Sequence, residues 1–544
     1  MNRVAHYLQE HLLGEVLTST DARKYFSTDG GVFSVVPTMI VYPRNENDVR
    51  KVARFTWQLA ERGRVIPITA RGAGSDQAGA AIGTGIILGF MAHMKRIVEF
   101  DSRRGLLTVE PGANYAKVQQ ALHTHGRFLP PYPSSIDYAT LGGAVANNAA
   151  GEKTIKYGAT REYVSSLRVV LANGEVIQTK KLNKRELNKK MGQSNFEGEI
   201  YRNLDKLFEE NQETIDKIHL DVTKNSAGYD IVDVKKKGTF DLTPLIVGSQ
   251  GTLGIVTEAT FNTEPYNPKT VLIAAYFNDI ETAKNAVLEL RKLPEMPSAI
   301  EVVDENLLNF IDAHNPNQLK GIVDKPFHKL IVLIEFDNYN TRIKKRMAKR
   351  AIKILNSMNV EYEMQTEDEA KERLWKIRHS AAAVITHTEG KKKALPIVED
   401  GIVPIERFTE YLEGVYQIFD KYGLKIAIWG HAGNANLHMQ PFLDLSQVGD
   451  RQKVFKIIDE YYSLVINLGG STSGEHSDGR LRAPYLPQLY GAEVYTLFQK
   501  IKEIFDPYNS LNPGVKINVT LDDIKPLLRH EYSMEHLYDH LPRS

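Results

Sequence analysis

Short apolar runs alternate with helical patterns along the first third of the chain. Residues 38–42, 65–68, 85–88 and 167–171 have the length and the β-branched content of buried strands. Residues 46–62 carry apolar positions at helical spacing, and Asn45 is placed to cap the first turn. This alternation predicts a domain that mixes helices and strands.

The pattern changes after residues 263–270, which hold two prolines and show no periodicity. Beyond them, residues 271–276 and 330–334 are predicted strands, and residues 280–292 and 340–356 are predicted amphipathic helices. Repeated strand–helix–strand units of this kind indicate an antiparallel sheet backed by helices.

Length and pattern together predict three parts. A chain of 544 residues exceeds one domain of about 100–200 residues. We expect an α+β protein with a first domain over residues 1–265, a second domain over 266–516 and a polar tail over 517–544. The first domain is expected to begin with a helical extension at about residues 1–33.

Composition narrows the class of protein. Hydrophobic residues make up 42% of the chain and charged residues 25%, which is typical of a soluble globular protein. The net charge of +1 gives no sign of nucleic-acid binding. Because the chain has no cysteine, disulfides, thiolate zinc sites, cysteine nucleophiles and iron–sulfur clusters of its own are excluded.

The sequence predicts a cytoplasmic protein. It lacks an apolar run of about 18 residues and a signal peptide at its N-terminus. Lysine-rich runs at residues 180–190, 344–350 and 391–393 leave a peripheral membrane contact open. A solvated helix face is the commoner interpretation of such a run.

Three glycine-rich segments in the first domain are candidates for binding a nucleotide. They are Arg71-Gly72-Ala73-Gly74-Ser75, the stretch 130–151 and the stretch 248–256. Glycine lets backbone N–H groups approach a phosphate closely, and Arg71 adds positive charge. Each segment alone could be an ordinary turn, but three in one domain make a large nucleotide ligand credible.

Histidines gather in the second domain. His431 and His438 lie seven positions apart across a glycine and asparagine turn, and Glu475-His476 follows in another glycine-rich stretch. Two imidazoles and a carboxylate suit zinc, manganese or iron, whereas a single histidine is usually structural. His476 is then a candidate base. Arg378 lies on a predicted helix, where a surface arginine with a buried stem is the alternative.

The glycine-rich segments resemble the FAD-binding domain of the vanillyl-alcohol oxidase and p-cresol methylhydroxylase superfamily. The resemblance rests on the ordered motifs RGAGS, PYPSS, TLGGAVANNAAG, YGATREYV and GSQGTLGIVTE between about residues 37 and 261. It implies a two-part FAD-binding domain of the p-cresol methylhydroxylase type. The FAD would be bound by Arg71, Gly72, Ala73, Gly74, Ser75, Pro133, Ser134, Gly142, Gly143, Asn148, Gly151, Gly254 and Ile255.

The second domain is similar to the C-terminal substrate domain of FAD-linked D-2-hydroxy acid dehydrogenases. Their pattern GHxGDGNxH, GEHG and DPxxxLNPGK reads here as GHAGNANLH, GEHS and DPYNSLNPGVK within residues 270–516. The resemblance implies that His431, His438 and Glu475 bind a divalent metal and that His476 is the base. It also implies that Arg378 and Asn436 bind substrate and that Asn512 lies near the flavin.

The two resemblances imply an FAD-dependent dehydrogenase that oxidises a D-2-hydroxy acid, such as D-lactate or D-2-hydroxyglutarate, to the 2-oxo acid. The FAD is expected to be non-covalent, because Ser75-Asp76-Gln77 stands where relatives attach it through histidine and cysteine is absent. Electrons would pass to a quinone, an electron-transfer flavoprotein or a separate iron–sulfur subunit, and a homodimer stays open.

Two other functions remain open at this point. The chain could be a flavin-binding subunit, or a diverged protein, without hydroxy-acid chemistry of its own, or it could be a flavin oxidase that uses oxygen. Asn434, Ala435 and Ser477 stand where the hydroxy acid dehydrogenase pattern has aspartate, glycine and glycine. If those glycines need a positive φ, alanine or serine there costs on the order of a kcal/mol.

Overall fold

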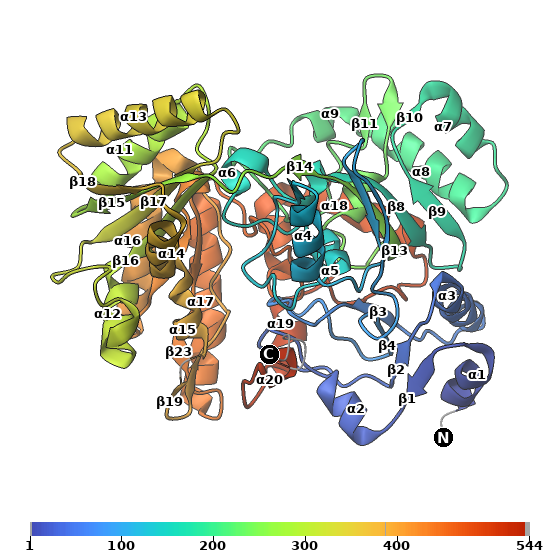
Figure 1. The fold of residues 1–544 in the computed structure, drawn as a ribbon. Helices are drawn as coiled ribbons and strands as arrows, with labels where there is room; N and C mark the ends of the chain where they lie inside the picture. The colour runs from blue at the N-terminus through green and yellow to red at the C-terminus, as the bar shows by residue number, and fades with distance from the viewer. Residues whose placement is uncertain (1–2, 387, 539–544) are drawn as a thin grey trace.

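The computed structural model describes residues 3–386 and 388–538, so the first two residues of the predicted extension and residues 539–544 of the predicted tail lie outside the described part. The molecule has two halves that meet along its middle (Figure 1). One half is built around a six-stranded sheet, and the other around a four-stranded and a five-stranded sheet. This mixture of helices and largely antiparallel sheets confirms the predicted α+β class.

The four-stranded sheet holds the first glycine-rich segment at the end of one strand. Its order is β1 (Glu15–Leu17), β2 (Met39–Tyr42), β4 (Ile86–Gly89) and β3 (Ile68–Arg71). β2, β4 and β3 run parallel, and β1 adds an antiparallel edge. Helices α1 (Arg3–His11) and α3 (Glu46–Ala60) contribute to its apolar core.

The structure corrects two local predictions in this sheet and confirms a third. The strand predicted at 65–68 begins only at Ile68, since Pro67 has no N–H and the Ile68 N–H donates to the Ser510 carbonyl oxygen. The N-terminal extension is not purely helical, because it supplies β1. Asn45 caps α3 as predicted, accepting a hydrogen bond from the Asp48 N–H.

The five-stranded sheet is antiparallel and packs against helices of the same half. Its order is β5 (Ile97–Asp101), β6 (Leu106–Val109), β13 (Ile255–Asn262), β8 (Val164–Val170) and β9 (Val176–Thr179). The helices packed into its core are α4 (Tyr115–Thr124), α5 (Leu141–Asn147), α8 (Phe196–Glu210) and α18 (Leu486–Phe505). α18 comes from late in the chain but packs among elements of the first domain, where its red ribbon is seen in Figure 1.

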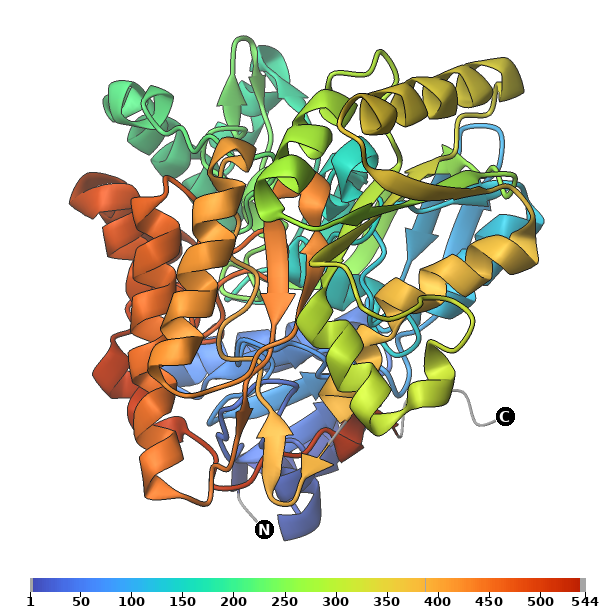
Figure 2. The ribbon, with the colours of Figure 1, turned by 90° about the vertical axis from the view of Figure 1, so that its left-hand side faces the viewer.

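The six-stranded sheet confirms the predicted antiparallel sheet of the second domain. Its order is β18 (Glu361–Gln365), β15 (Val271–Phe277), β17 (Leu330–Phe336), β16 (Ala299–Asp304), β21 (Ile428–His431) and β22 (Asn436–Met439). Alternate residues of β15 point into two separate apolar cores, so helices cover both faces (Figure 2).

One core includes α11 (Ile280–Arg291), α13 (Thr341–Ser357), α16 (Phe408–Lys421) and α17 (Val448–Asn467). The other includes α12 (Glu305–His314) and α14 (Asp368–His379). The predicted helices at 280–292 and 340–356 are thereby confirmed to within one residue at each end.

Shorter elements connect these layers. They are α2 (Thr20–Tyr25), β7 (Arg127–Phe128), α6 (Thr154–Tyr157), β10 (Leu182–Asn183), α7 (Lys184–Met191), α9 (Gln212–Asp216), β11 (Lys235–Lys236), β12 (Thr239–Phe240), α10 (Thr243–Ile246), β14 (Glu264–Pro265), α15 (Ala381–Thr386), β19 (Thr388–Glu389), β20 (Lys392–Ala394), β23 (Phe442–Leu443), α19 (Leu521–Ile524) and α20 (Glu535–Tyr538). Among the described residues, no helix is long and apolar enough to cross a bilayer.

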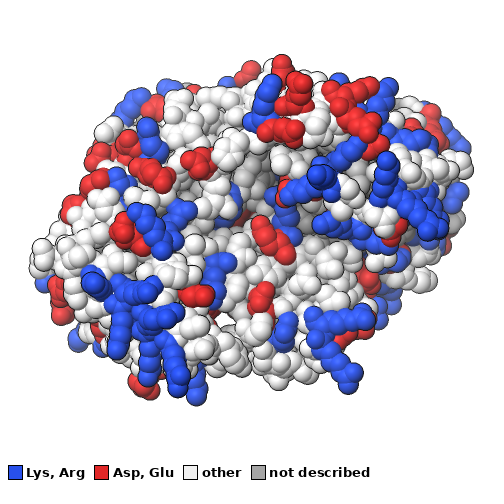
Figure 3. Space-filling view, turned by 90° about the horizontal axis from the view of Figure 1, so that it is seen from above, with Lys and Arg blue, Asp and Glu red and all other residues white. Residues whose placement is uncertain are grey.

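Lysine and arginine side chains gather at both ends of one face of the molecule. Seen from above, they lie over the end that carries α13 and over the end that carries α7 (Figure 3). Arg342, Lys345, Arg346, Lys349 and Arg350 of α13 are all exposed. Lys344, which begins this run, is buried.

Candidate functional site

A large cavity lies where β3 ends and α5 begins. It is lined by residues 70–77, 133–135 and 142–144, by Ser249, Gln250 and Gly251, and by His476. With the solvent at its mouth included, its volume is about 1450 Å³. Several separate stretches of the chain line it and many of the lining residues are glycines, so the cavity suits an extended ligand that lies against backbone.

The first loop of the cavity is built to receive an anion. The backbone N–H groups of residues 72–77 donate to no acceptor among the described residues. Arg71 is 2% exposed, and its Nη2 likewise has no partner in the described part of the chain. Gly74 has a φ of 75°, and a Cβ there would lie 2.2 Å from Arg71 Nη2. Unpaired N–H groups beside a buried guanidinium fit the phosphates of a dinucleotide.

Most of the residues predicted to bind FAD line this cavity. They are Arg71, Gly72, Ala73, Gly74, Ser75, Pro133, Ser134, Gly142, Gly143 and Gly254. The structure does not place Asn148, Gly151, Ile255 or Asn512 on its wall.

The four residues off the wall support the loops that form it. Asn512 donates to the carbonyl oxygens of Ala80 and Gln250. Asn148 accepts the Arg161 N–H, Gly151 packs against Tyr132, and Ile255 is fully buried.

Part of the predicted polar tail closes the same cavity. Met534 lines it, and the Tyr532 hydroxyl donates to the Gly30 carbonyl oxygen. His536 Nε2 lies 3.2 Å from the Gly74 carbonyl oxygen. Residues 532–536 therefore form a strap against the loop that carries the unpaired N–H groups. No local pattern predicts this contact, because the strap is distant from residues 30 and 74 along the chain.

His431, His438, Glu475 and His476, which we call the histidine cluster, meet beside the cavity. The β21–β22 hairpin brings the first two together, since Trp429 pairs with His438 and His431 pairs with Asn436. Glu475 Oε1 lies 3.0 Å from His431 Nε2 and 3.1 Å from His438 Nε2. The two Nε2 atoms are 3.5 Å apart. The structure thus unites the three predicted metal ligands.

The far side of each imidazole explains why these atoms fit a cation. His431 Nδ1 lies 2.7 Å from Glu301 Oε1, and His438 Nδ1 lies 3.3 Å from Glu399 Oε2. A carboxylate accepts a hydrogen bond from Nδ1–H, so each Nε2 offers a lone pair when it carries no proton. Burial opposes a charge on His431, but Glu301 and Glu475 outweigh burial and raise its pKa, so without a cation a proton lies between its Nε2 and Glu475. Once that proton leaves, two lone pairs and the Glu475 oxygen converge. A divalent cation satisfies all three, and this donor set is typical of zinc or manganese.

A buried lysine fixes the other oxygen of Glu475. Lys224 Nζ lies 2.7 Å from Glu475 Oε2, and both side chains are about 4% exposed. Burial alone would raise the pKa of Glu475, but Lys224 and His431 outweigh it and hold that pKa well below its usual value. Glu475 is therefore a carboxylate with one oxygen committed to Lys224 and one facing the imidazoles.

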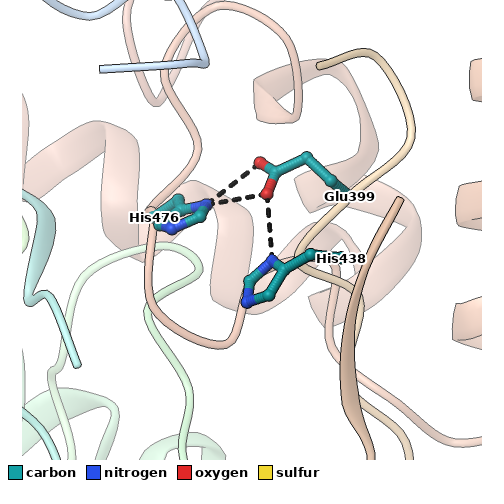
Figure 4. Close-up of side chains that lie close together, drawn as sticks. All are labelled: Glu399, His438 and His476. Atoms are coloured by element: carbon teal, nitrogen blue, oxygen red, sulfur yellow. Dashed lines mark hydrogen bonds and ion pairs between the residues drawn. The ribbon is translucent and has the colours of Figure 1, made fainter. Parts of the chain in front are cut away.

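His476 joins the histidine cluster to the glycine-lined cavity. Its Nδ1 lies 2.8 Å from Glu399 Oε2 (Figure 4). Its side chain lines the cavity, and its Nε2 lies 3.9 Å from Glu475 Oε1. Burial opposes its positive charge, but Glu399 and Asp400 outweigh burial and raise the pKa of His476 to about 10. With no cation bound, His476 is thus protonated at neutral pH.

Glu399, His438 and His476 form a second group with metal-ligand spacing (Figure 4). Arg482 is fully buried and its Nη2 forms an ion pair with Glu399 Oε1. That guanidinium already neutralises the carboxylate, and both His438 and His476 turn their Nδ1 atoms toward Glu399 Oε2. The group therefore fits a hydrogen-bonded support better than a second metal site.

Arg378 and Asn436 occupy different environments. Arg378 is buried on α14, and its Nε donates to Glu301 Oε2 at 2.8 Å. Its Nη atoms donate to no described residue, so they remain available to an anion. Asn436 is fully buried, and its Nδ2 donates to Asp400 and to the Gly401 carbonyl oxygen. Only its Oδ1 lacks a partner, which makes Asn436 mainly a support for the hairpin.

Sequence reasoning missed Glu301, Glu399, Asp400, Lys224 and Arg482. Glu301 did carry a signal, because a carboxylate between Ile300 and Val302 in a buried strand must have a buried partner. Glu399-Asp400 carried a weaker one, as an acidic pair between apolar runs. Nothing local marked Lys224 or Arg482.

Two departures from the family pattern do sit at left-handed backbone positions. Ala435 has a φ of 52° and Ser477 a φ of 57°. The expected cost of a side chain there therefore applies. At the third position, Asn434 donates through Nδ2 to the Thr223 hydroxyl.

Family models match both halves of the chain. Residues 37–180 match the model described as "FAD binding domain", and residues 267–515 match "FAD linked oxidases, C-terminal domain". Residues 1–36 and 516–538, which supply Gly30 and the strap, lie outside both matches.

Two curated relatives and one solved structure extend the comparison. Glycolate oxidase subunit GlcD of Bacillus subtilis (strain 168) is 30% identical, over 92% of this chain and 92% of that protein. D-2-hydroxyglutarate dehydrogenase of Escherichia coli (strain K12) is 30% identical over 94% of this chain, which spans about half (51%) of that relative's length. The 4-ethylphenol oxidase of Gulosibacter chungangensis shares the fold, with a TM-score of 0.65 at 16% identity over 95% of this chain and 97% of that one.

Proposed function

The chain belongs to the FAD-linked oxidase family, and from that premise we propose that it oxidises a D-2-hydroxy acid to the corresponding 2-oxo acid. One observation carries the proposal. His476 lines the cavity suited to FAD and also faces Glu475 of the histidine cluster. A titratable imidazole therefore lies between the cavity suited to FAD and the residues that would hold a metal ion.

Each residue then has a distinct role. The Arg378 Nη atoms bind the substrate carboxylate, since Nε is held by Glu301. His431, His438 and Glu475 would hold a zinc, manganese or iron ion, which as a Lewis acid lowers the pKa of a substrate hydroxyl. His476 Nε2 takes the hydroxyl proton as the α-hydrogen leaves.

His476 can act as a base only after it loses its own proton. The neighbouring carboxylates raise its pKa to about 10, and a divalent cation beside Glu475 acts in the opposite direction. A cation held by His431, His438 and Glu475 would therefore also favour the deprotonated form of His476 that the base role needs.

FAD, held non-covalently, supplies the acceptor for the hydride from the substrate α-carbon. The loop at residues 72–77 and Arg71 would bind its phosphates. Because the 544 residues contain no cysteine, the electrons leave for a separate acceptor, such as a quinone, an electron-transfer flavoprotein or an iron–sulfur subunit.

The test follows the flavin spectrum. FAD-loaded protein is mixed without oxygen with D-lactate, D-2-hydroxyglutarate, glycolate and the L-isomers. We expect one D-acid to bleach the flavin, a chelator to abolish the bleaching and zinc or manganese to restore it. An unchanged spectrum with every acid would overturn the proposal and favour a flavin-binding subunit without this chemistry. Peroxide formed at the rate of turnover would favour an oxygen-using oxidase.

A histidine variant tests the base. His476→Ala should slow flavin reduction by at least about 100-fold and leave FAD content unchanged, as expected for loss of general-base catalysis. His328→Ala serves as the control, because His328 is an imidazole on the second domain that contacts Asn278 and lies outside the histidine cluster. Equal rates in His476→Ala and wild type would remove His476 from this role.

A further inference from the structure

Glu301 connects two functional groups that the sequence keeps far apart. It lies on β16, which pairs with β21 and so places it beside His431. Its Oε1 lies 2.7 Å from His431 Nδ1, and its Oε2 accepts the Arg378 Nε–H at 2.8 Å. Glu301 is 1% exposed, so water does not compete for either contact. A single buried carboxylate thus orients one metal-binding imidazole and one guanidinium.

Glu399 makes the corresponding connection on the other side of the histidine cluster. Its Oε2 lies 3.3 Å from His438 Nδ1 and 2.8 Å from His476 Nδ1. Arg482 holds its Oε1, and Glu399 is also 1% exposed. By receiving Nδ1 of both rings, it turns Nε2 of His438 toward the metal ligands and Nε2 of His476 toward Glu475.

Neither carboxylate reaches the converging atoms themselves. Both act on the rings from behind, through Nδ1, so they are positioning residues. The pairing is asymmetric, because Glu301 shares its second oxygen with a substrate-binding group whereas Glu399 shares one oxygen between a metal ligand and the base.

We propose that Glu301 and Glu399 each couple one metal-binding imidazole to one substrate-handling group. Glu301 couples His431 to Arg378, and Glu399 couples His438 to His476. Loss of either weakens metal binding, but only Glu301 sets substrate affinity and only Glu399 sets the rate of proton transfer. The assignment of substrate roles rests on the function proposed above, whereas the coupling to metal does not.

The test compares Glu301→Gln, Glu399→Gln and Glu335→Gln in the FAD-loaded protein. Glu335 on β17 is a matched control, because it is buried and paired with Lys153 yet contacts neither imidazole. Zinc affinity is measured by competition with a fluorescent chelator. We expect about 10- to 100-fold weaker zinc binding in the first two variants, the usual range for lost outer-shell partners, and less than threefold change in the control.

Flavin reduction at saturating zinc separates the two carboxylates. Glu301→Gln should raise the acid concentration for half-maximal reduction at least tenfold and leave the limiting rate within about threefold. Glu399→Gln should lower the limiting rate at least tenfold and leave the half-saturating concentration within about threefold. The variants Glu301→Asp and Glu399→Asp keep the charge and should recover part of each loss, and they take over the comparison if an amide variant does not fold.

Each outcome has a defined meaning. Unchanged zinc affinity in both amide variants overturns the inference. The same kinetic parameter falling in both variants overturns the division between substrate affinity and proton transfer. If wild type is reduced by no hydroxy acid but zinc affinity still falls as expected, the proposed function fails and the metal coupling stands.

Discussion

The glycine-lined cavity and the histidine cluster achieve binding by opposite means. The cavity presents backbone N–H groups of residues 72–77 and the Arg71 Nη2, which have no partner among the described residues, and its loops come from short contiguous segments. The cluster presents side chains only, and every one of its charges is already paired with a buried partner. The cavity therefore depends on backbone N–H groups that no protein acceptor occupies and on glycines that have no side chain. The cluster depends on contacts between side chains from distant parts of the fold.

This difference predicts which substitutions most weaken ligand binding or stability in each site. A side chain added to the glycine loop fills the space for the ligand and displaces Arg71. A charge removed from the cluster leaves its partner buried and unpaired, which costs more than the pair contributes. Variants of the two regions should differ in size of effect and in the ligand that rescues them.

Lys224→Met should have the largest effect. It leaves the buried Glu475 carboxylate without its ammonium partner, so we expect the free energy of unfolding of the metal-free protein to fall by about 3 kcal/mol. Saturating zinc should recover most of that loss, since the cation then compensates Glu475. Chemical denaturation with and without zinc measures both values.

Lys516→Met is the control for that variant. Lys516 and Asp478 form another fully buried ion pair, at 2.6 Å, and Asp478 is not in the histidine cluster. Its loss should destabilise the protein to a similar extent, without recovery by zinc. If zinc rescues both variants equally, or neither, the cluster is not distinguished from any other buried ion pair.

Gly74→Ala tests the cavity and should have the next largest effect. The residue has a φ of 75°, and a Cβ would lie 2.2 Å from Arg71 Nη2, so the guanidinium must move. We expect FAD to bind about 10- to 100-fold more weakly, which corresponds to about 1.4 to 2.7 kcal/mol. Fluorescence titration of the FAD-free protein measures the Kd.

Gly63→Ala separates the effect of backbone strain from the effect of displacing the Arg71 guanidinium. Gly63 has a similar φ of 79°, but nothing lies within 4 Å of its Cβ position. It should lower stability by about 1 kcal/mol and leave the Kd for FAD unchanged. A weakened Kd in both variants would mean that backbone strain alone, and not Arg71, controls FAD binding.

The same contrast explains how much could be predicted from sequence. Gly72 and Gly74 follow a strand directly, so local pattern and the family resemblance found the cavity, although Pro67 delayed the strand to Ile68. His431 and His438 were found because a short hairpin joins them. Glu301 and Glu399 were not, because their role exists only once β16 pairs with β21 and residue 399 lies beside His438 and His476. An acidic residue among apolar ones is a local signal of a buried partner, but which residues become the partners depends on this long-range pairing and leaves no local pattern.

The strap at residues 532–536 gives a smaller effect on the same cavity. Met534→Ala with His536→Ala removes one lining side chain and the contact to the Gly74 carbonyl oxygen. We expect FAD to bind about three- to tenfold more weakly, with zinc affinity unchanged, because the strap does not reach the histidine cluster. The two titrations described above measure both. Altered zinc affinity would show that the two regions are not independent.

Ser477 lies between the two regions and should show the smallest effect. Its hydroxyl lies 3.0 Å from the Ser226 carbonyl oxygen and 3.1 Å from that of Asn147, and its φ is 57°. Ser477→Ala keeps the left-handed strain and loses the hydrogen bond, so it should destabilise the protein by about 1 kcal/mol. Ser477→Gly also loses the bond but relieves the strain, so its net change should be smaller. Thermal unfolding of the pair measures the difference, and an equal loss in both would mean that the serine here carries no backbone strain to relieve.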